Sequence, residues 1–443
     1  MKGRGYTVLG SDRGARTDFY TDEHGIPIWR ERRELPPDTT LVVYSLAIDS
    51  ADPQIIDAEK RGLTTVSRAQ LLGALMSMSP RRICVSGSHG KSTTTALVEH
   101  ILTESGRGHT AVSGATLSSG RAYADTGDDF FLAEACEYKD SFLSLCPTHQ
   151  IITSVELDHT DYFATLEDIK RSFLRASRLA ETLIINLDDP VAREIADELS
   201  DSKYGEKLYT PTGYMAKNDQ KRPNTVITYG KSEVANFKIH GVTHTDDKTS
   251  FSLTYDRETL RLSTSLIGDF NLYNIASATA LAISLGVDRE SVVRAVGSFL
   301  GIERRLSLLG AIEGVPVYYD YAHHPREIAS VIEALRERYG ALTVIFRPHT
   351  YSRTASLWQD FITALSKADR VILLDVFPAR EKPIDGVSSK RLAECIEGAI
   401  YCPVQSDAIG LVEDVKEGAI ALLGAGEVEQ VKSDLIAKCK KHG

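Results

Sequence analysis

The 443-residue sequence lacks several features that would point to other classes of protein. It has no run of about 18 consecutive apolar residues, so we expect no membrane-spanning helix. Its six cysteines show no CxxC spacing, which argues against a zinc site or a disulfide framework and predicts a reduced, cytoplasmic setting. The start of the chain does not have the pattern of a secretion signal. Internal repeats and low-complexity segments are missing as well.

An excess of positive charge is also missing. The formal net charge of −10 argues against nucleic acid or an anionic membrane as the main partner. The hydrophobic content of 42% and the charged content of 25% are typical of a soluble globular protein. An anionic ligand would therefore have to be bound by a local arrangement of cations, a metal ion and backbone N–H groups. The sequence indicates no particular oligomeric state.

Strand-like and helix-like patterns alternate along most of the chain, which is typical of βαβ units and a parallel sheet. Between about 207 and 267 four strand patterns follow one another without helices, and they predict a small antiparallel subsheet. A further βα series begins near 304. Since about 150 residues make a typical domain, we expect three domains, namely residues 1–78, 79–303 and 304–443.

The stretch CVSGSHGKSTTTAL, residues 84–97, ends an apolar strand and opens a helix. Glycines let a backbone wrap closely around an anion, and a helix N-terminus presents N–H groups to phosphate. Lys91 would reach the terminal phosphates of a nucleotide, and Ser92 would bind Mg²⁺. Val85 stands where the longer P-loop pattern has its first glycine, so a glycine-rich turn that only caps a helix is the alternative. The predicted nucleotide-binding residues of this loop are Gly87, Ser88, His89, Gly90, Lys91, Ser92 and Thr93.

Acidic residues follow the next two predicted strands. Glu134 and Glu137 end one of them, and Glu156, Asp158 and His159 follow the other. These residues should emerge at the carboxyl edge of the sheet, where α/β proteins bind their ligands. Two like charges about 4 Å apart repel each other by about 4 kcal/mol at an effective dielectric constant of about 20. Carboxylates beside a triphosphate therefore predict a bound Mg²⁺, and solvated loop residues are the alternative.

Taken in order, these residues resemble the Mur ligase family. The central ATPase domain of that family has a short GTxGK[ST] loop, an acidic strand end and a histidine after the next strand. Here GSHGKS, Glu134 and His159 occupy those places. The resemblance implies that Ser92, Glu134 and His159 hold Mg²⁺ and that Lys91 contacts the phosphates of ATP.

The resemblance also implies an α/β fold with three domains. We expect a truncated Rossmann-like N-terminal domain for a UDP-sugar, a central P-loop ATPase domain with a small antiparallel subsheet, and a Rossmann-like C-terminal domain for an amino acid. Full-length members open with a GxGGxGM-type loop that holds uridine diphosphate, whereas Met1 here falls after that unit. This difference predicts a fragment, a misplaced start or a natural loss.

Two stretches beyond the acidic strand ends match the family as well. In GDFNLYN, residues 268–274, the resemblance places Asn271 and Asn274 against the nucleotide. Asparagine is also a good helix cap, so a helix start is the alternative for both. GIERRL, residues 301–306, resembles the arginine-bearing entry to the third domain and implies that Arg305 lies against the phosphates.

The finer resemblance is to the branch of the family that joins L-alanine to UDP-N-acetylmuramate. It is carried by His89 in the loop, by YDYAHHP at 319–325 and by FRPHTYSRT at 346–354. The resemblance implies that Asp320 lines the nucleotide side and that His349 and Arg353 lie near the incoming amino acid. Taken alone, His349 and Arg353 would be interpreted as a helix cap and a surface arginine.

The reaction implied by the resemblance is amide formation driven by ATP, through an acyl phosphate, in peptidoglycan precursor synthesis. The implied catalytic residues are Lys91, Glu134, His159, Arg305, His349 and Arg353. Three alternatives stay open: a related ligase for another amino acid or a peptide, a P-loop GTPase or kinase, and an impaired fragment that still binds ATP. The chain has no NKxD motif, which argues against a GTPase.

Overall fold

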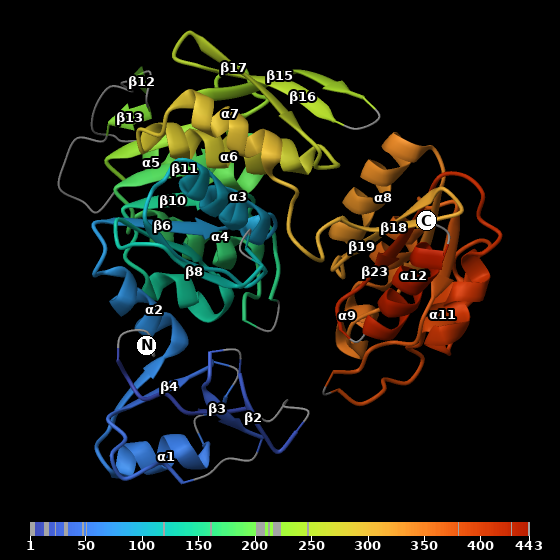
Figure 1. Cartoon of the computed structure of the whole chain (residues 1–443), viewed down its shortest axis with the longest axis horizontal. Helices are drawn as coiled ribbons and strands as arrows, with labels where there is room; N and C mark the ends of the chain where they lie inside the picture. The colour runs from blue at the N-terminus through green and yellow to red at the C-terminus, as the bar shows by residue number, and fades with distance from the viewer. Residues whose placement is uncertain are drawn as a thin grey trace. The chain divides into compact units, whose positions relative to one another are not determined.

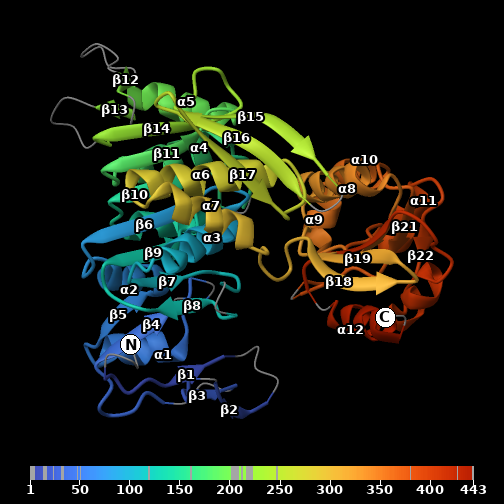
Figure 2. The same ribbon diagram turned by 45° about the horizontal axis from the view of Figure 1, so that its top comes forward.

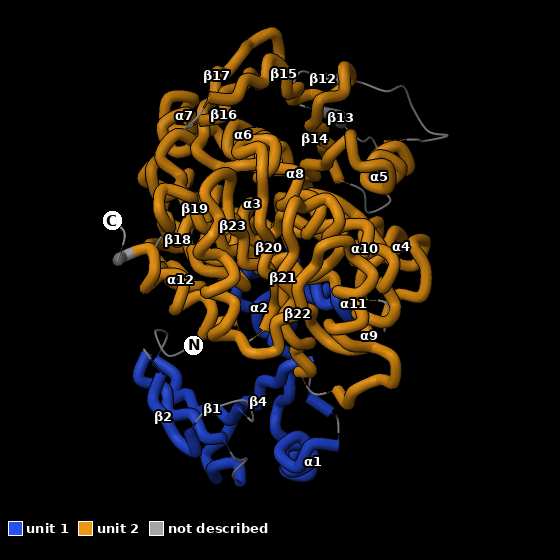
Figure 3. The backbone as a smooth tube through the Cα atoms, turned by 90° about the vertical axis from the view of Figure 1, so that its right-hand side faces the viewer, with its two compact units in different colours: residues 1–78, 138–146 blue, residues 79–137, 147–443 orange. Residues whose placement is uncertain are grey.

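The chain, shown in Figure 1 as a computed structural model, forms two compact units. One unit comprises residues 1–78 with 138–146, and the other comprises 79–137 with 147–443 (Figure 3). This division leaves our predicted boundary near 303 untested, so the three domain ranges stay a prediction. The structure describes all residues except 1–4, 13–16, 23, 31–33, 47, 50, 118–119, 160–161, 201–208, 211–212, 216–222, 246–247, 380, 427 and 442–443.

The first unit contains two small sheets. One has the strand order β1-β3-β2, and the other is the parallel pair β4-β5, which is connected through α1 in a βαβ unit. Asp52 caps α1 by accepting a hydrogen bond from the Gln54 N–H, and Ser67 and Gln70 form a capping box at α2. The bounds are β1 Gly10–Ser11, β2 Phe19–Thr21, β3 Pro27–Trp29, β4 Leu41–Tyr44, α1 Pro53–Lys60, β5 Thr64–Ser67 and α2 Arg68–Met76.

The segment 138–146 belongs to the first unit because it packs closely on α2. A Cβ atom added to Gly73 in α2 would overlap the carbonyl oxygen of Ser144, so only glycine allows this approach. Lys139 in the same segment donates a hydrogen bond from Nζ to the Leu46 carbonyl, 3.0 Å away. The 3₁₀ turns at Tyr138–Ser144 are labelled η2.

The first part of the second unit is built on a twelve-stranded sheet with the order β17-β16-β15-β14-β11-β10-β6-β9-β7-β8, and β13 and β12 pair beside β14. Figure 2 shows these strands in sequence across the sheet. The pairs from β14 to β7 are parallel, as the alternating strand and helix patterns predict. The bounds are β6 Arg81–Ser86, β7 His109–Val112, β8 Tyr123–Asp125, β9 Phe130–Glu134, β10 His149–Ile152, β11 Thr182–Asn186, β12 Tyr209–Thr210, β13 Gly213–Met215, β14 Thr225–Gly230, β15 Phe237–His244, β16 Thr249–Tyr255 and β17 Glu258–Thr264.

The predicted small antiparallel subsheet is present, but it contains fewer of the strands between 207 and 267 than we expected. Strands β15, β16 and β17 do pair antiparallel, but β14 pairs in parallel with both β11 and β15. The reason is that α5 precedes β14 and returns the chain across the sheet, so β14 extends the parallel part. The antiparallel strands are therefore continuous with the main sheet. Residues 207 and 208, where the prediction began, lie outside the described residues.

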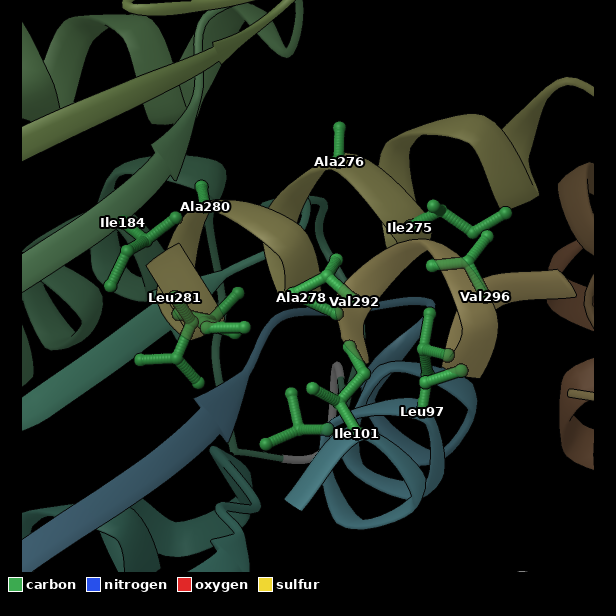
Figure 4. Close-up of a cluster of buried hydrophobic side chains, with 14 of the residues drawn as sticks. Leu97, Ile101, Ile184, Ile275, Ala276, Ala278, Ala280, Leu281, Val292 and Val296 are labelled. Atoms are coloured by element: carbon green, nitrogen blue, oxygen red, sulfur yellow. The ribbon is translucent and has the colours of Figure 1, made fainter. Parts of the chain in front are cut away.

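Three helices share one hydrophobic core on this sheet. Figure 4 shows Leu97 and Ile101 of α3 next to Val296 and Val292 of α7. Ile275 and Leu281 of α6 and Ile184 of β11 belong to the same cluster. The small side chain of Ala278 on α6 lies beside Val292 of α7. This core fixes α3, and hence the loop at its N-terminus, on the sheet. The helices of this part are α3 Lys91–Glu104, α4 Leu166–Ser177, α5 Pro190–Ser200, α6 Phe270–Ser284 and α7 Arg289–Ser298.

The last part of the chain folds around a six-stranded sheet with the order β18-β19-β23-β20-β21-β22. All its pairs are parallel except β18 with β19. One buried cluster includes α8, α10 and α11, and a second, on strand residues of alternating position, includes η3 and α12, so both faces are covered. The bounds are β18 Ser307–Ile312, β19 Val315–Asp320, α8 Pro325–Tyr339, β20 Leu342–Phe346, α9 Tyr351–Ser356, α10 Trp358–Leu365, β21 Arg370–Leu373, α11 Ser389–Glu394, β22 Ile400–Tyr401, η3 Gln405–Val412, β23 Ala419–Leu423 and α12 Glu429–Lys441.

None of the helices that the structure describes is both long and apolar enough to cross a bilayer.

Candidate functional site

The glycine-rich loop lies where the sequence predicts it, between β6 and α3. Gly90 precedes α3 with a φ of 82°, and no side chain caps the first N–H groups of this helix. A Cβ atom at Gly90 would lie 2.5 Å from the Asn274 Oδ1, and one at Gly87, whose φ is 139°, would overlap Thr153. The loop therefore requires glycine at both positions, and it leaves N–H groups available for an anion.

Lys91 begins α3 and folds back over the loop. Its Nζ donates to the carbonyls of Gly87 and Ser88 and to both carboxylate oxygens of Glu137, 3.0 and 3.1 Å away. Burial, the largest single influence, would lower the pKa of Lys91, but the charge and hydrogen bonds of Glu137, together with the charges of Cys136 and Glu134, raise this pKa overall. The ammonium group is therefore charged and fixed near the loop, as a phosphate-binding lysine must be.

Ser92 and Glu134 are brought into direct contact. The Ser92 hydroxyl donates to Glu134 Oε1 at 3.0 Å, and Glu134 Oε2 accepts from the Ser113 hydroxyl and the Gly114 N–H, each at 2.9 Å. These donors hold the carboxylate at the end of β9. The hydroxyl and carboxylate oxygens are the donor types that Mg²⁺ prefers, so this pair fits such an ion.

His159, the third predicted metal ligand, lies beside Glu137. Its Nε2 is 3.7 Å from Glu137 Oε1, and its backbone has a φ of 54°. Among the described residues no group of three or more histidine, cysteine, aspartate or glutamate side chains is arranged to hold a metal. The place of His159 in a metal site therefore stays a prediction.

A pocket of about 270 Å³ opens at the loop. Its walls include the predicted nucleotide-binding residues His89, Gly90, Ser92, Thr93, Asn271, Asn274, Arg305 and Asp320. Asn274 donates to Asn271 Oδ1 at 3.0 Å, and Asn271 donates to the Ile267 carbonyl at 2.9 Å. Asp269 stands at the N-cap of α6, so neither asparagine caps this helix. A helix does begin at this stretch, but neither asparagine is its N-cap, and their contact with a nucleotide stays a prediction.

Asp320 ends β19 beside Arg305. It is buried, and it accepts hydrogen bonds from the N–H groups of Leu306 and Ala322, each at 2.7 Å. Burial raises the pKa of Asp320 to about 6, against the opposing charge of Arg305. Arg305 also lies 3.6 Å from Glu327, measured from Nη1 to Oε1. Asp320 thus fixes the turn that carries Arg305 into the pocket.

His89 contacts two carboxylates, that of Glu156, which follows β10, and that of Glu327 on α8. Its Nε2 lies 3.3 Å from Glu156 Oε2, and its Nδ1 lies 3.3 Å from Glu327 Oε1. Burial alone would lower the pKa of His89, but the hydrogen bonds and charges of Glu156 and Glu327 together raise it to about 9. Arg326 contacts the same Glu156 oxygen at 2.8 Å. Since both ring nitrogens face acceptors, the ring is an imidazolium at neutral pH.

Glu327 and Arg326 were not predicted from the sequence. Glu327 accepts hydrogen bonds from the backbone N–H groups of His323 and His324 in the capping box of α8. The spacing of His324 and Glu327, with Pro325 at the first helical position, is a helix-start pattern that could have located this carboxylate. The charged partner across the pocket could not be deduced from that pattern.

The alkaline stability of the protein should depend on His89. The pKa of His89 is about 9 in the folded state, above its ordinary value of 6.5, so protonation of this ring stabilises the folded state. The whole of this stabilisation is present below pH 6.5, and it is lost as the pH rises through 9. We expect unfolding free energy to fall over this range by at most about 1.4 kcal/mol per pH unit from this group. The carboxylates facing the ring are Glu156 and Glu327, which Arg326 and Arg305 contact in turn, and the ring of His324 lies 6.3 Å away.

Thermal unfolding from pH 6 to 10 checks this expectation when the Tm values of the unaltered protein are compared with those of His89→Asn. The pH dependence of Tm should be flatter in His89→Asn than in the unaltered protein. His100→Asn is the matched control: His100 lies on α3, is bonded to Ser298, and its replacement should leave the curve unchanged. Equal curves for the unaltered protein and His89→Asn would contradict the assigned charge.

His349 and Arg353 lie together near His323. Arg353 Nη1 is 3.4 Å from His349 Nδ1, and the rings of His349 and His323 are 5.9 Å apart. Burial, with a further contribution from the Arg353 charge, lowers the pKa of His349 to about 4, so this ring is neutral near pH 7. Thr350 stands at the N-cap of α9, so His349 is not the cap of that helix.

Comparison with known proteins agrees with this arrangement. Residues 304–426 match the "Mur ligase, glutamate ligase domain", and residues 85–212 and 209–282 match the "Mur ligase middle domain". The UDP-N-acetylmuramate–L-alanine ligase of Caldicellulosiruptor saccharolyticus is 32% identical, over 97% of this chain and 93% of its own. The chain belongs to the Mur ligase family.

Further Mur ligases are similar in sequence and in fold. The UDP-N-acetylmuramate–L-alanine ligase of Syntrophotalea carbinolica is 34% identical, over 96% of this chain and 91% of its own. The crystal structure of UDP-N-acetylmuramate-alanine ligase from Thermotoga maritima superposes with a TM-score of 0.77 at 21% identity, over all of this chain and 95% of that one. The predicted family and the predicted Mur ligase architecture are thus confirmed.

Proposed function

We propose that this Mur ligase joins L-alanine to the lactyl carboxylate of UDP-N-acetylmuramate at the expense of ATP, in peptidoglycan precursor synthesis. The observation that carries the proposal is the loop of Gly87–Ser92 with Lys91, the Ser92–Glu134 pair and the asparagine-lined pocket all in one place. The similarity to curated L-alanine ligases over nearly the whole chain supports the choice of substrate. We further propose that the reaction takes place in the cytoplasm.

The first step activates the carboxylate. A carboxylate oxygen of the substrate bonds to the γ-phosphorus while the bond from that phosphorus to the bridging oxygen of ADP breaks, which gives an acyl phosphate and ADP. Both reactants are anionic, so the site must neutralise them. Lys91 and the uncapped N–H groups of α3 would bind the phosphates, and Arg305, which lines the same pocket, would neutralise charge that develops during transfer.

Ser92 and Glu134 would hold Mg²⁺, with His159 as a further candidate ligand. When bound, this ion neutralises the phosphate oxygens and lowers the charge repulsion between the reactants. The contact between Ser92 and Glu134 supports the first two ligands, because it places a hydroxyl and a carboxylate oxygen within 3.0 Å at the foot of the loop.

The second step forms the amide bond. The amine nitrogen of L-alanine bonds to the acyl carbon, the bond from that carbon to the phosphate oxygen breaks, and the nitrogen loses a proton as phosphate leaves. Arg353 would hold the carboxylate of L-alanine in a charge-assisted pair. A neutral His349 beside it would add no positive charge that repels the incoming amino group.

An assay of ADP release tests the proposal. Purified protein with ATP, Mg²⁺ and UDP-N-acetylmuramate should release ADP when L-alanine is added, and mass spectrometry should find the product heavier by one alanine residue. Glycine, L-serine and a tripeptide are tested in parallel. A preference for the tripeptide would favour a related ligase, and ADP binding without any ligation would favour an impaired chain. Preference for GTP would contradict the proposal.

A further inference from the structure

Glu137 is a buried carboxylate to which the proposed reaction gives no task. Its side chain is fully buried, and the carboxylate pairs with the Lys91 ammonium through both oxygens. A buried ion pair of this kind is often no more stabilising than hydrocarbon side chains of the same volume, because both charges must lose water. Stability alone therefore does not explain why this position carries a charge.

All three N–H donors of the Lys91 ammonium group have acceptors in the described structure. An ammonium group has three donors, and those of Lys91 reach the Gly87 carbonyl, the Ser88 carbonyl and the Glu137 carboxylate. A phosphate oxygen can thus be bound by Lys91 only if one of these acceptors is released. The two carbonyls belong to the loop itself, whereas Glu137 follows β9 and has the same sign of charge as the phosphate.

We propose that Glu137 is a positioning residue. It forms an ion pair with Lys91 when no nucleotide is bound, and this pair breaks when a phosphate group binds Lys91. The carboxylate keeps the ammonium group oriented toward the loop, and it lowers the affinity for ADP because binding must break this pair. When the products leave, the ion pair between Glu137 and Lys91 forms again. The inference rests on the proposed nucleotide site, and it does not depend on which amino acid is ligated.

The matched substitution is Glu137→Gln, which keeps the size of the side chain and one acceptor oxygen. We expect this variant to bind ADP about tenfold more tightly in EDTA, because a neutral amide competes less strongly for Lys91 than a carboxylate does. The gain should be smaller with Mg²⁺, which already screens the phosphates. Isothermal titration calorimetry with ADP measures both values.

Two further variants show whether the effect passes through Lys91. In Lys91→Met ADP binding should weaken, and adding Glu137→Gln to that variant should change the affinity no further. Glu99→Gln is the control, because Glu99 on α3 is also a buried glutamate. Its carboxylate lies 3.6 Å from His109 Nε2 and not beside Lys91. This control should bind ADP like the unaltered protein.

The inference is overturned if Glu137→Gln binds ADP as the unaltered protein does or more weakly, or if the gain persists in the Lys91→Met background. Should Glu137→Gln be unstable without ligand, the rise in Tm on adding ADP gives the same comparison and should exceed that of the unaltered protein. Failure of the unaltered protein to bind ADP would overturn the nucleotide site and this inference together. Normal ADP binding without ligation would count against the proposed function alone.

Discussion

Replacing Lys91 by alanine should lower kcat for ligation by about a hundredfold to a thousandfold, which is the range for losing one preorganised charge partner of a transition state. The reason is that Lys91 is the ammonium group fixed over the loop, four residues beyond Gly87, where the triphosphate would bind. Steady-state ADP release at saturating ATP and L-alanine measures the effect. Retention of even a tenth of the activity would contradict the role of Lys91.

The same substitution should also reduce stability, because it leaves the buried Glu137 carboxylate without its ammonium partner. Removing one member of a buried ion pair typically costs about 3–5 kcal/mol. The double variant Lys91→Ala/Glu137→Gln removes both charges, so it should regain stability in urea unfolding while staying inactive. This pair of variants separates a loss of catalysis from a loss of fold.

Replacing Glu134 by glutamine should lower kcat by about a hundredfold and raise the Mg²⁺ concentration needed for half-maximal activity. Glutamine keeps the size of the side chain but removes the charge that faces Ser92. A titration of activity with MgCl₂ measures both changes.

Ser113→Ala is the matched control for Glu134. It removes one hydrogen bond to the Glu134 carboxylate but leaves the charge in place, so its Mg²⁺ requirement should change little. An unaltered Mg²⁺ requirement in Glu134→Gln would mean that this carboxylate does not hold the ion.

The parts of the site that could be predicted from the sequence are those carried by local patterns. The loop of Gly87–Ser92 follows an apolar strand and opens a helix, and local sequence alone determines that geometry. The grouping of Ser92 with Glu134 was implied by the resemblance to the Mur ligase family, and the structure brings them together because β6 and β9 are neighbouring parallel strands whose carboxyl ends share one edge.

The remaining features depend on contacts between distant residues. The bonds of His89 join residues 67 and 238 positions apart, and nothing in the loop sequence specifies Glu156 or Glu327 as its partners. Glu137 was noted as an acidic residue at a strand end, but its pairing with Lys91 depends on how the chain turns after β9. The parallel pairing of β14 was missed because a strand pattern does not reveal the direction of its neighbour.

A crystal structure with a non-hydrolysable ATP analogue and Mn²⁺ tests the central claim most directly. The account predicts that the triphosphate lies on the loop of Gly87–Ser92 with Lys91 at the terminal phosphates. It also predicts an anomalous Mn²⁺ peak within bonding distance of Ser92 and Glu134. A nucleotide bound elsewhere, with the metal far from Ser92 and Glu134, would contradict it.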